Sequence, residues 1–243
     1  MSRVKALFGG GGPRPEIDWP AWEARIGRIV TSEVERVLPY FPDDGVIVDV
    51  GANIGLFTAT LLGRRPRASA ICFEPVASFC ERCRARFADN PRVRIENLAL
   101  GNRNERTTIY KPTHNPGGNS LVRAQVEIYT SKHRVNWERE QVEVRIFDDW
   151  AREAGITRVD LIKTDTEGHD YAVLQGVLPF LERTGQRPVI LSELLAKSLH
   201  HAWDEQMAVV ERLYALGYQK VDLESMREID DILFVPAGRA RVE

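Results

Sequence analysis

Residues 46–58 read Val-Ile-Val-Asp-Val-Gly-Ala-Asn-Ile-Gly-Leu-Phe-Thr. A short run of β-branched residues leads into a glycine turn at Gly51 and Gly55, and a segment typical of a helix follows. Glycines at such a turn let the backbone approach a ligand closely, and the first N–H groups of the helix point toward it. The stretch therefore predicts a strand, a turn and a helix that together bind a nucleotide-like cofactor.

The alternation of strands and helices continues along the chain. Short β-branched runs predict strands at Val46–Val50, Ala68–Phe73, Val93–Asn97, Val159–Thr164, Pro188–Glu193, Tyr218–Leu223 and Asp231–Val235. Apolar residues at helical spacing predict helices at Gly55–Gly63, Ala77–Ala88, Tyr171–Glu182 and Asp204–Leu216. Strands that alternate with helices pair in parallel and are covered on both faces. We predict a doubly wound α/β fold.

The rest of the 243 residues is expected to extend one catalytic domain. Residues 1–16 include four consecutive glycines and two prolines, and predict a flexible tail. A single domain is expected over 17–243, beginning with a helix at Pro20–Leu38. Residues 101–147 are predicted to be an insertion, with β-leaning segments around a polar loop whose part 115–121 could close over the ligands.

Composition and charge favour a small-molecule partner. Lys+Arg 33 against Asp+Glu 35 gives a net charge of −2, without the basic excess that binding to a nucleic acid needs. No apolar run approaches the roughly 20 residues that span a bilayer. The N-terminal segment lacks the apolar region of a secretory signal, and the three Cys suggest reduced thiols, so we expect a cytoplasmic protein. The sequence leaves open whether the protein forms a homo-oligomer.

The spacing around the glycine turn selects among nucleotide cofactors. The dinucleotide pattern would place glycines where this chain has Asn53 and Leu56, and no P-loop Gly-Lys-Ser/Thr follows the turn. The chain instead has Asp-x-Gly-x-x-x-Gly from Asp49 to Gly55, and Glu74 ends the next strand 23 residues after Gly51. An acid there can accept hydrogen bonds from ribose hydroxyls. S-adenosylmethionine, which has a ribose and no phosphates, fits this pattern.

A set of motifs in order resembles one family. The motifs are Asp49-Val-Gly-Ala-Asn-Ile-Gly55, Phe73-Glu-Pro75, Asn97-Leu-Ala-Leu-Gly101, Asn119-Ser-Leu121, Phe147-Asp-Asp149 and Asp160-Leu-Ile-Lys163-Thr-Asp165-Thr-Glu167-Gly168-His-Asp170. Together they resemble the FkbM family of S-adenosylmethionine-dependent methyltransferases. The resemblance spans 46–193, and His169-Asp170 departs from the family's usual small residue and Glu.

The resemblance implies a fold and a reaction. The fold is the Rossmann-like, three-layer class I methyltransferase sandwich, with a mostly parallel seven-stranded sheet whose last strand is antiparallel beside the fifth. The reaction is O-methylation of a hydroxyl on a sugar, a polyketide or another small metabolite. The residues expected to bind the cofactor are Asp49, Gly51, Ala52, Asn53, Gly55, Phe57, Glu74, Pro75, Asn97 and Asp165.

The acids after the fourth strand are the candidates for catalysis. An alcohol is a poor nucleophile while protonated, so a base is expected near the acceptor hydroxyl. Asp165 is the first choice, and Lys163, His169 and Glu193 are the other candidates. A divalent ion held by Asp165, Glu167 and Glu193 is a further hypothesis, although we do not predict a metal requirement.

Three alternatives remain at this stage. An NAD(P)-dependent oxidoreductase would share the α/β sheet but needs the missing glycine spacing. A non-catalytic nucleoside-binding module would keep Asp49 and Glu74 without acids converging after the fourth strand. A nucleic acid methyltransferase is disfavoured by the charge and by the lack of an Asn/Asp-Pro-Pro-Tyr/Phe segment for a flipped base.

Overall fold

The computed structural model describes residues 17–113, 115–132, 135–221 and 229–242. The main sheet has seven strands in the order β3-β2-β1-β7-β8-β10-β9. These strands are β1 (Val46–Val50), β2 (Ser69–Phe73), β3 (Val93–Glu96), β7 (Leu161–Thr164), β8 (Val189–Leu195), β9 (Tyr218–Val221) and β10 (Ile229–Pro236). The predicted tail, residues 1–16, and the end of the predicted strand Tyr218–Leu223 lie outside the described residues.

The strand order confirms the predicted fold class. β1 pairs in parallel with β2 and with β7, so the chain reverses its direction of winding between β1 and β7. β10 pairs antiparallel with β8, with Asp231 opposite Glu193, as predicted for a last strand beside the fifth. Ligands in such sheets bind beyond the carboxyl ends of the strands at the reversal. The β1–β7 boundary is therefore where a site is expected.

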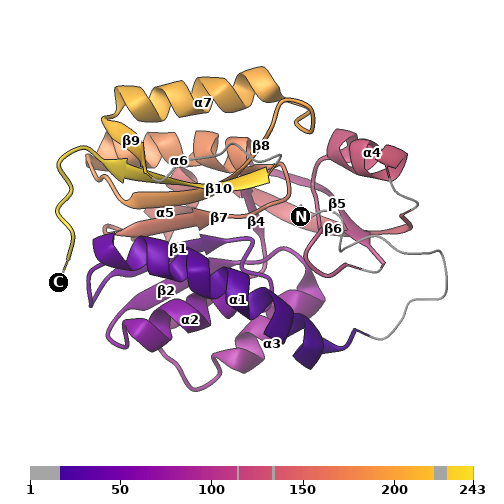
Figure 1. The fold of residues 1–243 in the computed structure, drawn as a ribbon, viewed down its shortest axis with the longest axis horizontal. Coiled ribbons are helices and arrows are strands. Elements are labelled where there is room, and N and C mark those ends of the chain that lie inside the picture. Colours follow the sequence, from indigo (N-terminus) through magenta and orange to yellow (C-terminus); the bar gives the residue numbers. More distant parts are fainter. Residues whose placement is uncertain (1–16, 114, 133–134, 222–228, 243) are drawn as a thin grey trace.

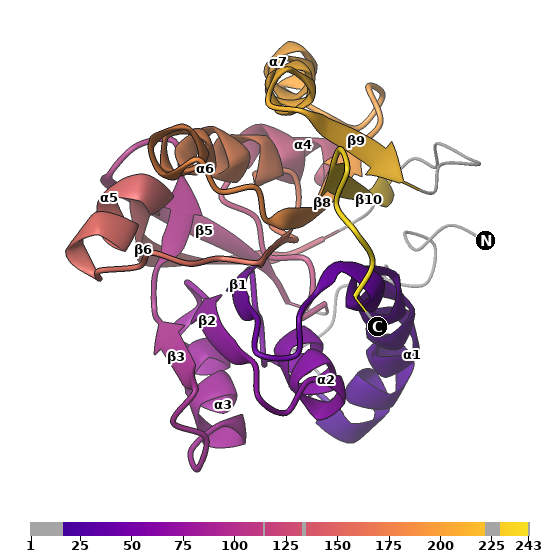
Figure 2. The same cartoon turned by 90° about the vertical axis from the view of Figure 1, so that its left-hand side faces the viewer.

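Helices cover both faces of the main sheet (Figures 1 and 2). The helices are α1 (Trp19–Val37), α2 (Leu56–Arg64), α3 (Ala77–Arg86), α4 (Arg123–Lys132), α5 (Phe147–Glu153), α6 (Asp170–Thr184) and α7 (Trp203–Ala215), with a 3-10 turn, η2 (Leu38–Tyr40), after α1. The first three lie on one face, whereas α5, α6 and α7 lie on the other. Ile47 and Val48 of β1 belong to opposite cores, which explains why the strands are apolar on both sides.

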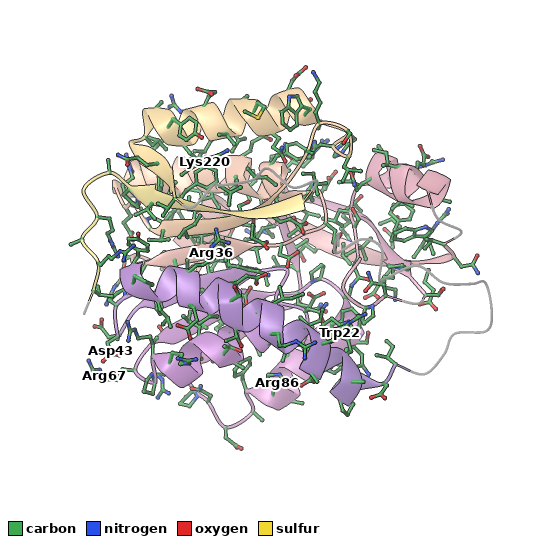
Figure 3. All side chains as sticks on the ribbon, in the orientation of Figure 1. Trp22, Arg36, Asp43, Arg67, Arg86 and Lys220 are labelled. Carbon is green, nitrogen blue, oxygen red and sulfur yellow. The ribbon has the colours of Figure 1, made fainter. Side chains whose placement is uncertain are left out.

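The leading helix is fixed against the glycine turn. α1 begins at Trp19, one residue before the predicted start, and the Asp18 side chain accepts a hydrogen bond from the Ala21 N–H (3.0 Å). Arg86 of α3, labelled in Figure 3, donates to the Ile54 carbonyl (2.7 Å) and to Glu23 on α1 (2.8 Å). The N-terminal half of α1 thus flanks the turn after β1.

The insertion forms a second sheet of three strands in the order β4-β6-β5. The strands are β4 (Ala99–Gly101), β5 (Glu105–Pro112) and β6 (Trp137–Ile146). The predicted β-leaning segments lie within β5 and β6, which pair antiparallel, except that Phe147 begins α5. Helices α4 and α5 were not predicted. α5 has only seven residues, and α4 carries no apolar stripe, because it buries only Gln125 and Val126 among its described side chains.

None of the helices in the described part of the chain is long and apolar enough to cross a membrane. The division into a tail and a single domain over residues 17–243 stays a prediction.

Candidate active site

The turn after β1 has a backbone conformation that residues other than glycine rarely adopt. Gly51, Asn53 and Gly55 have φ values of 75°, 53° and 79°, in the left-handed region. A β-carbon on Gly51 would overlap the carbonyl oxygen of Asp165, which follows β7. The Gly51 and Ala52 N–H groups donate to the Phe73 carbonyl (3.0 and 3.1 Å). The glycine turn therefore brings the ends of three neighbouring strands together.

Glu74 is buried at the end of β2, against this turn. Its Oε2 accepts from the Asn53 N–H (2.8 Å) and its Oε1 from the Val76 N–H (2.8 Å). Burial raises the pKa of Glu74 to about 7, although both N–H groups favour the ionised form. Each carboxylate oxygen has a second lone pair. The side chain can therefore accept hydrogen bonds from a ligand while it stays fixed to the backbone.

Asp49 lies beneath the turn and is fully buried. Its Oδ2 accepts from the Thr58 hydroxyl (2.7 Å), and its Oδ1 is 3.8 Å from Lys163 Nζ. Oδ1 has no hydrogen bond from any described residue. Burial raises the pKa of Asp49, and the Lys163 ammonium opposes that shift. Asp49 thus couples β1, α2 and β7 electrostatically, with one oxygen left for a further donor.

Lys163 joins the acids of β1 and β7. Its buried Nζ is 3.4 Å from Asp165 Oδ2 as well as 3.8 Å from Asp49 Oδ1. Burial alone would lower the pKa of Lys163, but the carboxylates of Asp165 and Asp49 raise it above its usual value. The amine therefore stays protonated and does not act as a base. Lys163 instead forms an ion pair with Asp165, whose side chain is one third exposed.

Glu193 of β8 is buried beside these acids. Its Oε2 has no hydrogen-bond partner among the described residues. Burial, and then the carboxylates of Asp165 and Glu167, raise the pKa of Glu193 well above its usual value. The raised pKa favours the protonated carboxyl, which can donate a hydrogen bond.

His169 immediately precedes α6, and its ring lies beside Gly101 at the end of β4. A β-carbon on Gly101 would lie 3.0 Å from its Nε2, and the Tyr171 ring centroid is 6.1 Å from that of His169. Neither ring nitrogen is hydrogen-bonded to a described residue. Burial, and then His201, lower the pKa of His169 to about 4, so the imidazole is neutral.

The three-carboxylate metal hypothesis is not supported by the structure. No group of three or more His, Cys, Asp or Glu side chains in the described ranges is arranged to hold a metal ion. Burial and the neighbouring acids raise the pKa of Glu193, which opposes the ionised form that a hard cation needs.

The remaining predicted cofactor residues occupy different positions. Asn97 donates to the carbonyls of Glu74 (2.9 Å) and Pro75 (3.0 Å), so its amide nitrogen fixes the end of β2. Ala52 and Phe57 are buried in the core between α1, α2 and the sheet, and Lys163 Nζ lies 5.8 Å from the Phe57 ring centroid.

A loop from the insertion spans the two turns. We call residues 115–121 the roof loop. The Asn53 amide donates to the Pro116 carbonyl (2.9 Å), and the Ser120 hydroxyl donates to the Glu167 carbonyl (2.9 Å). The structure thus adds Pro116 and Ser120 to the site, beside the predicted residues. The sequence had indicated this loop twice, as the polar residues 115–121 of the insertion and as Asn119-Ser-Leu121 within the resemblance.

These residues fit the cofactor that the sequence predicts. The glycine turn leaves no room for a side chain at Gly51, Glu74 retains acceptor capacity, and Asp49 Oδ1 is an unsatisfied acceptor. An adenosine with an amino acid tail offers hydroxyl and ammonium donors to such acceptors. Glu74 would hold the ribose, and the acids of β1 and β7 would face the charged end.

The sequence matches the methyltransferase FkbM domain over residues 49–233, which is more than half of the chain. The chain belongs to this family. The FkbM match begins at Asp49 and extends through the glycine turn, Glu74, Lys163 and Glu193 to β10. The family assignment made from the sequence motifs is therefore confirmed.

Two curated relatives and one solved structure show the extent of the similarity. The 2-O-methyltransferase NoeI of Sinorhizobium fredii is 30% identical over 172 residues, 68% of each chain. The AMB antimetabolite synthetase AmbE of Pseudomonas aeruginosa is 30% identical over 56% of this chain but only 8% of its own length. Magnesium protoporphyrin IX methyltransferase of Synechocystis PCC 6803 superposes with a TM-score of 0.50 at 11% identity, covering 97% and 88% of the two chains. That likeness concerns the fold alone.

Proposed function

We propose that this FkbM protein transfers a methyl group from S-adenosylmethionine to a hydroxyl of a small metabolite. The observation that carries the proposal is the meeting of the glycine turn with the Asp165 turn, next to Glu74. The printed name of the relative NoeI, a 2-O-methyltransferase, supports oxygen as the methyl acceptor. A dehydrogenase would need the glycine spacing that this chain lacks, and the family that the chain matches is one of methyltransferases.

The proposed mechanism assigns a role to each acid and to the lysine. S-adenosylmethionine, when bound, supplies an electrophilic methyl group. Asp165 would accept the proton of the acceptor hydroxyl as that oxygen takes the methyl group, with S-adenosylhomocysteine as the leaving group. Lys163 holds Asp165 in place through the 3.4 Å ion pair. The roof loop excludes water and aligns the acceptor, because in-line transfer depends mainly on positioning.

The experiment that tests the reaction is a methyl-transfer screen. The protein is incubated with S-adenosylmethionine and matched sets of hydroxyl, amine and thiol compounds, and products are identified by mass spectrometry. We expect methylated products only from hydroxyl compounds. Methylation confined to amines or thiols would contradict O-methylation while leaving the methyltransferase assignment intact. Cytoplasmic location, the absence of a nucleic acid partner and the oligomeric state stay predictions.

Cofactor affinity is expected to rise with pH between about 6 and 8. Ribose hydroxyls donate to ionised Glu74, so bound ligand lowers a pKa that is about 7 in the free protein. Binding therefore strengthens as pH rises through 7, by at most about tenfold per pH unit. Calorimetric titration with S-adenosylhomocysteine at several pH values measures this slope.

The Glu74→Gln variant is the control for that slope. It should bind more weakly throughout and show no pH dependence in this window, because an amide does not ionise. An equal slope in the variant would show that another group causes the pH dependence. Asp170 is such a group, because burial and then Asp165 raise its pKa to about 6.

Loss of the Ser120 hydroxyl should loosen the roof loop. Ser120→Ala removes the bond to the Glu167 carbonyl, worth about 1 kcal/mol. We expect the acceptor KM to rise roughly fivefold with little change in cofactor affinity. Thr31→Ala is the matched control, because it removes a similar hydroxyl–carbonyl bond (2.7 Å) on the exposed side of α1. Equal KM values for wild type and Ser120→Ala would show that the loop does not order the acceptor site.

A further inference from the structure

The helix of the insertion buries a polar side chain that nothing in the described protein satisfies. Gln125 of α4 is 0% exposed, and neither Oε1 nor Nε2 has a hydrogen-bond partner among the described residues. Arg123, Ala124 and Glu127, its neighbours on the helix, are exposed. An unpaired buried amide costs about 1–3 kcal/mol, and apolar residues normally occupy such positions. The amide therefore calls for a partner that the described residues do not supply.

The position of Gln125 identifies where that partner would be. A β-carbon on Gly168 would lie 3.2 Å from Gln125 Cδ and 3.1 Å from Leu195 Cδ1. Gly168 belongs to the turn that follows Asp165, and Leu195 is the last residue of β8, two positions after Glu193. The Gln125 amide thus lies at the carboxyl ends of β7 and β8, beside the turn that follows Asp165. It is also near the roof loop, because Ser120 bonds to Glu167 in the same turn.

Gln206, which lies beside the same end of β8, is a buried glutamine whose amide is held by the backbone. Its Nε2 donates to the Leu195 carbonyl (2.9 Å), and its Oε1 accepts from the Leu195 N–H (3.3 Å). Gln206 is as deeply buried as Gln125, at 3% exposure, but both of its amide atoms are satisfied. Two buried glutamines thus lie near Leu195, and among the described residues only Gln206 has hydrogen-bond partners for its amide.

We propose that Gln125 is a specificity-determining residue that binds the methyl acceptor through a hydroxyl next to the one that is methylated. The proposal rests on the function proposed above. An amide offers both an acceptor and donors, so one hydroxyl can donate to Oε1 and another oxygen can accept from Nε2. The carboxylates of Asp165 and Glu167 disfavour an anionic acceptor. The substrate class is therefore a neutral compound with adjacent hydroxyls.

The first test compares two matched variants without any acceptor. Gln125→Met replaces an unpaired amide with an apolar side chain of similar size, so we expect the melting temperature of the protein to stay the same or rise. Gln206→Met leaves the Leu195 N–H and carbonyl without their side-chain partners, so we expect it to lower the melting temperature by about 4 °C or more. Both proteins should bind S-adenosylhomocysteine as wild type does. A Gln125→Met variant that is destabilised as much as Gln206→Met would overturn the proposal.

The second test uses methyl pyranosides as acceptor probes, each paired with the deoxy analogue that lacks the hydroxyl beside the methylated position. We expect Gln125→Met to raise the acceptor KM at least tenfold, and the deoxy analogue to lose affinity in wild type but not in the variant. Unchanged KM in the variant, or methylation of monohydroxy compounds alone, would refute the role of Gln125. Failure of wild type to bind the cofactor would instead refute the proposed function.

Discussion

Replacing Gly51 with alanine is expected to abolish cofactor binding and to lower the stability of the protein by about 3 kcal/mol or more. About 1–2 kcal/mol of this comes from the left-handed backbone, since Gly51 has a φ of 75°. The remainder arises because the added methyl group would overlap the backbone carbonyl of Asp165, which cannot rotate away as a side chain can. Thermal unfolding and titration with S-adenosylhomocysteine measure the two effects.

Gly185→Ala separates backbone strain from the overlap. Gly185 ends α6 with a φ of 70°, and a β-carbon there would meet nothing within 4 Å. This variant should lose about 1 kcal/mol of stability and bind the ligand as wild type does. If Gly51→Ala behaved like Gly185→Ala, the close contact between the turns after β1 and β7 would have no part in cofactor binding.

Asp165→Asn is expected to lower turnover by about 10²- to 10⁴-fold, the usual contribution of a general base. An amide keeps the shape of the carboxylate and can still accept from Lys163, which is 3.4 Å from Asp165 Oδ2. Cofactor affinity should therefore stay within a few-fold of wild type. Single-turnover kinetics, with the acceptor found in the screen, separate this loss from any change in binding.

Two comparisons define the role of Asp165. Asp44→Asn removes a carboxylate that pairs with Arg158 (3.2 Å) before the start of β1, at the opposite end of the sheet from the site, and should leave turnover unchanged. Lys163→Met should reduce turnover less than Asp165→Asn, because Lys163 acts through the position of Asp165. Turnover within twofold of wild type in Asp165→Asn would eliminate it as the base.

The sequence was sufficient to predict the main sheet because its central strands are buried on both faces. Runs such as Val46–Val50 and Val189–Leu195 are mostly apolar, and turn residues separate them from the helices. The insertion was less predictable. α4 lies at the periphery and buries Gln125 and Val126 among its described side chains, so its sequence carries no helical stripe of apolar residues.

The positions of the candidate site residues could be predicted from the strand ends. Their burial and ionisation could not. Asp49 and Glu74 could be placed at neighbouring strand ends, but their burial depends on how Thr58, Val76 and Lys163 pack around them. Such contacts join residues far apart in the chain, and no local pattern encodes them. Gln125 was not predicted either, because its burial depends on the tertiary packing of the insertion.

The most direct test of the central claim is equilibrium dialysis of radiolabelled S-adenosylmethionine against the purified wild-type protein, with Gly51→Ala and Gly185→Ala in parallel. We predict saturable binding of one molecule per chain to wild type and to Gly185→Ala, displaced by S-adenosylhomocysteine, and none to Gly51→Ala. Absence of binding to folded wild-type protein would contradict the account of the glycine turn as a cofactor site.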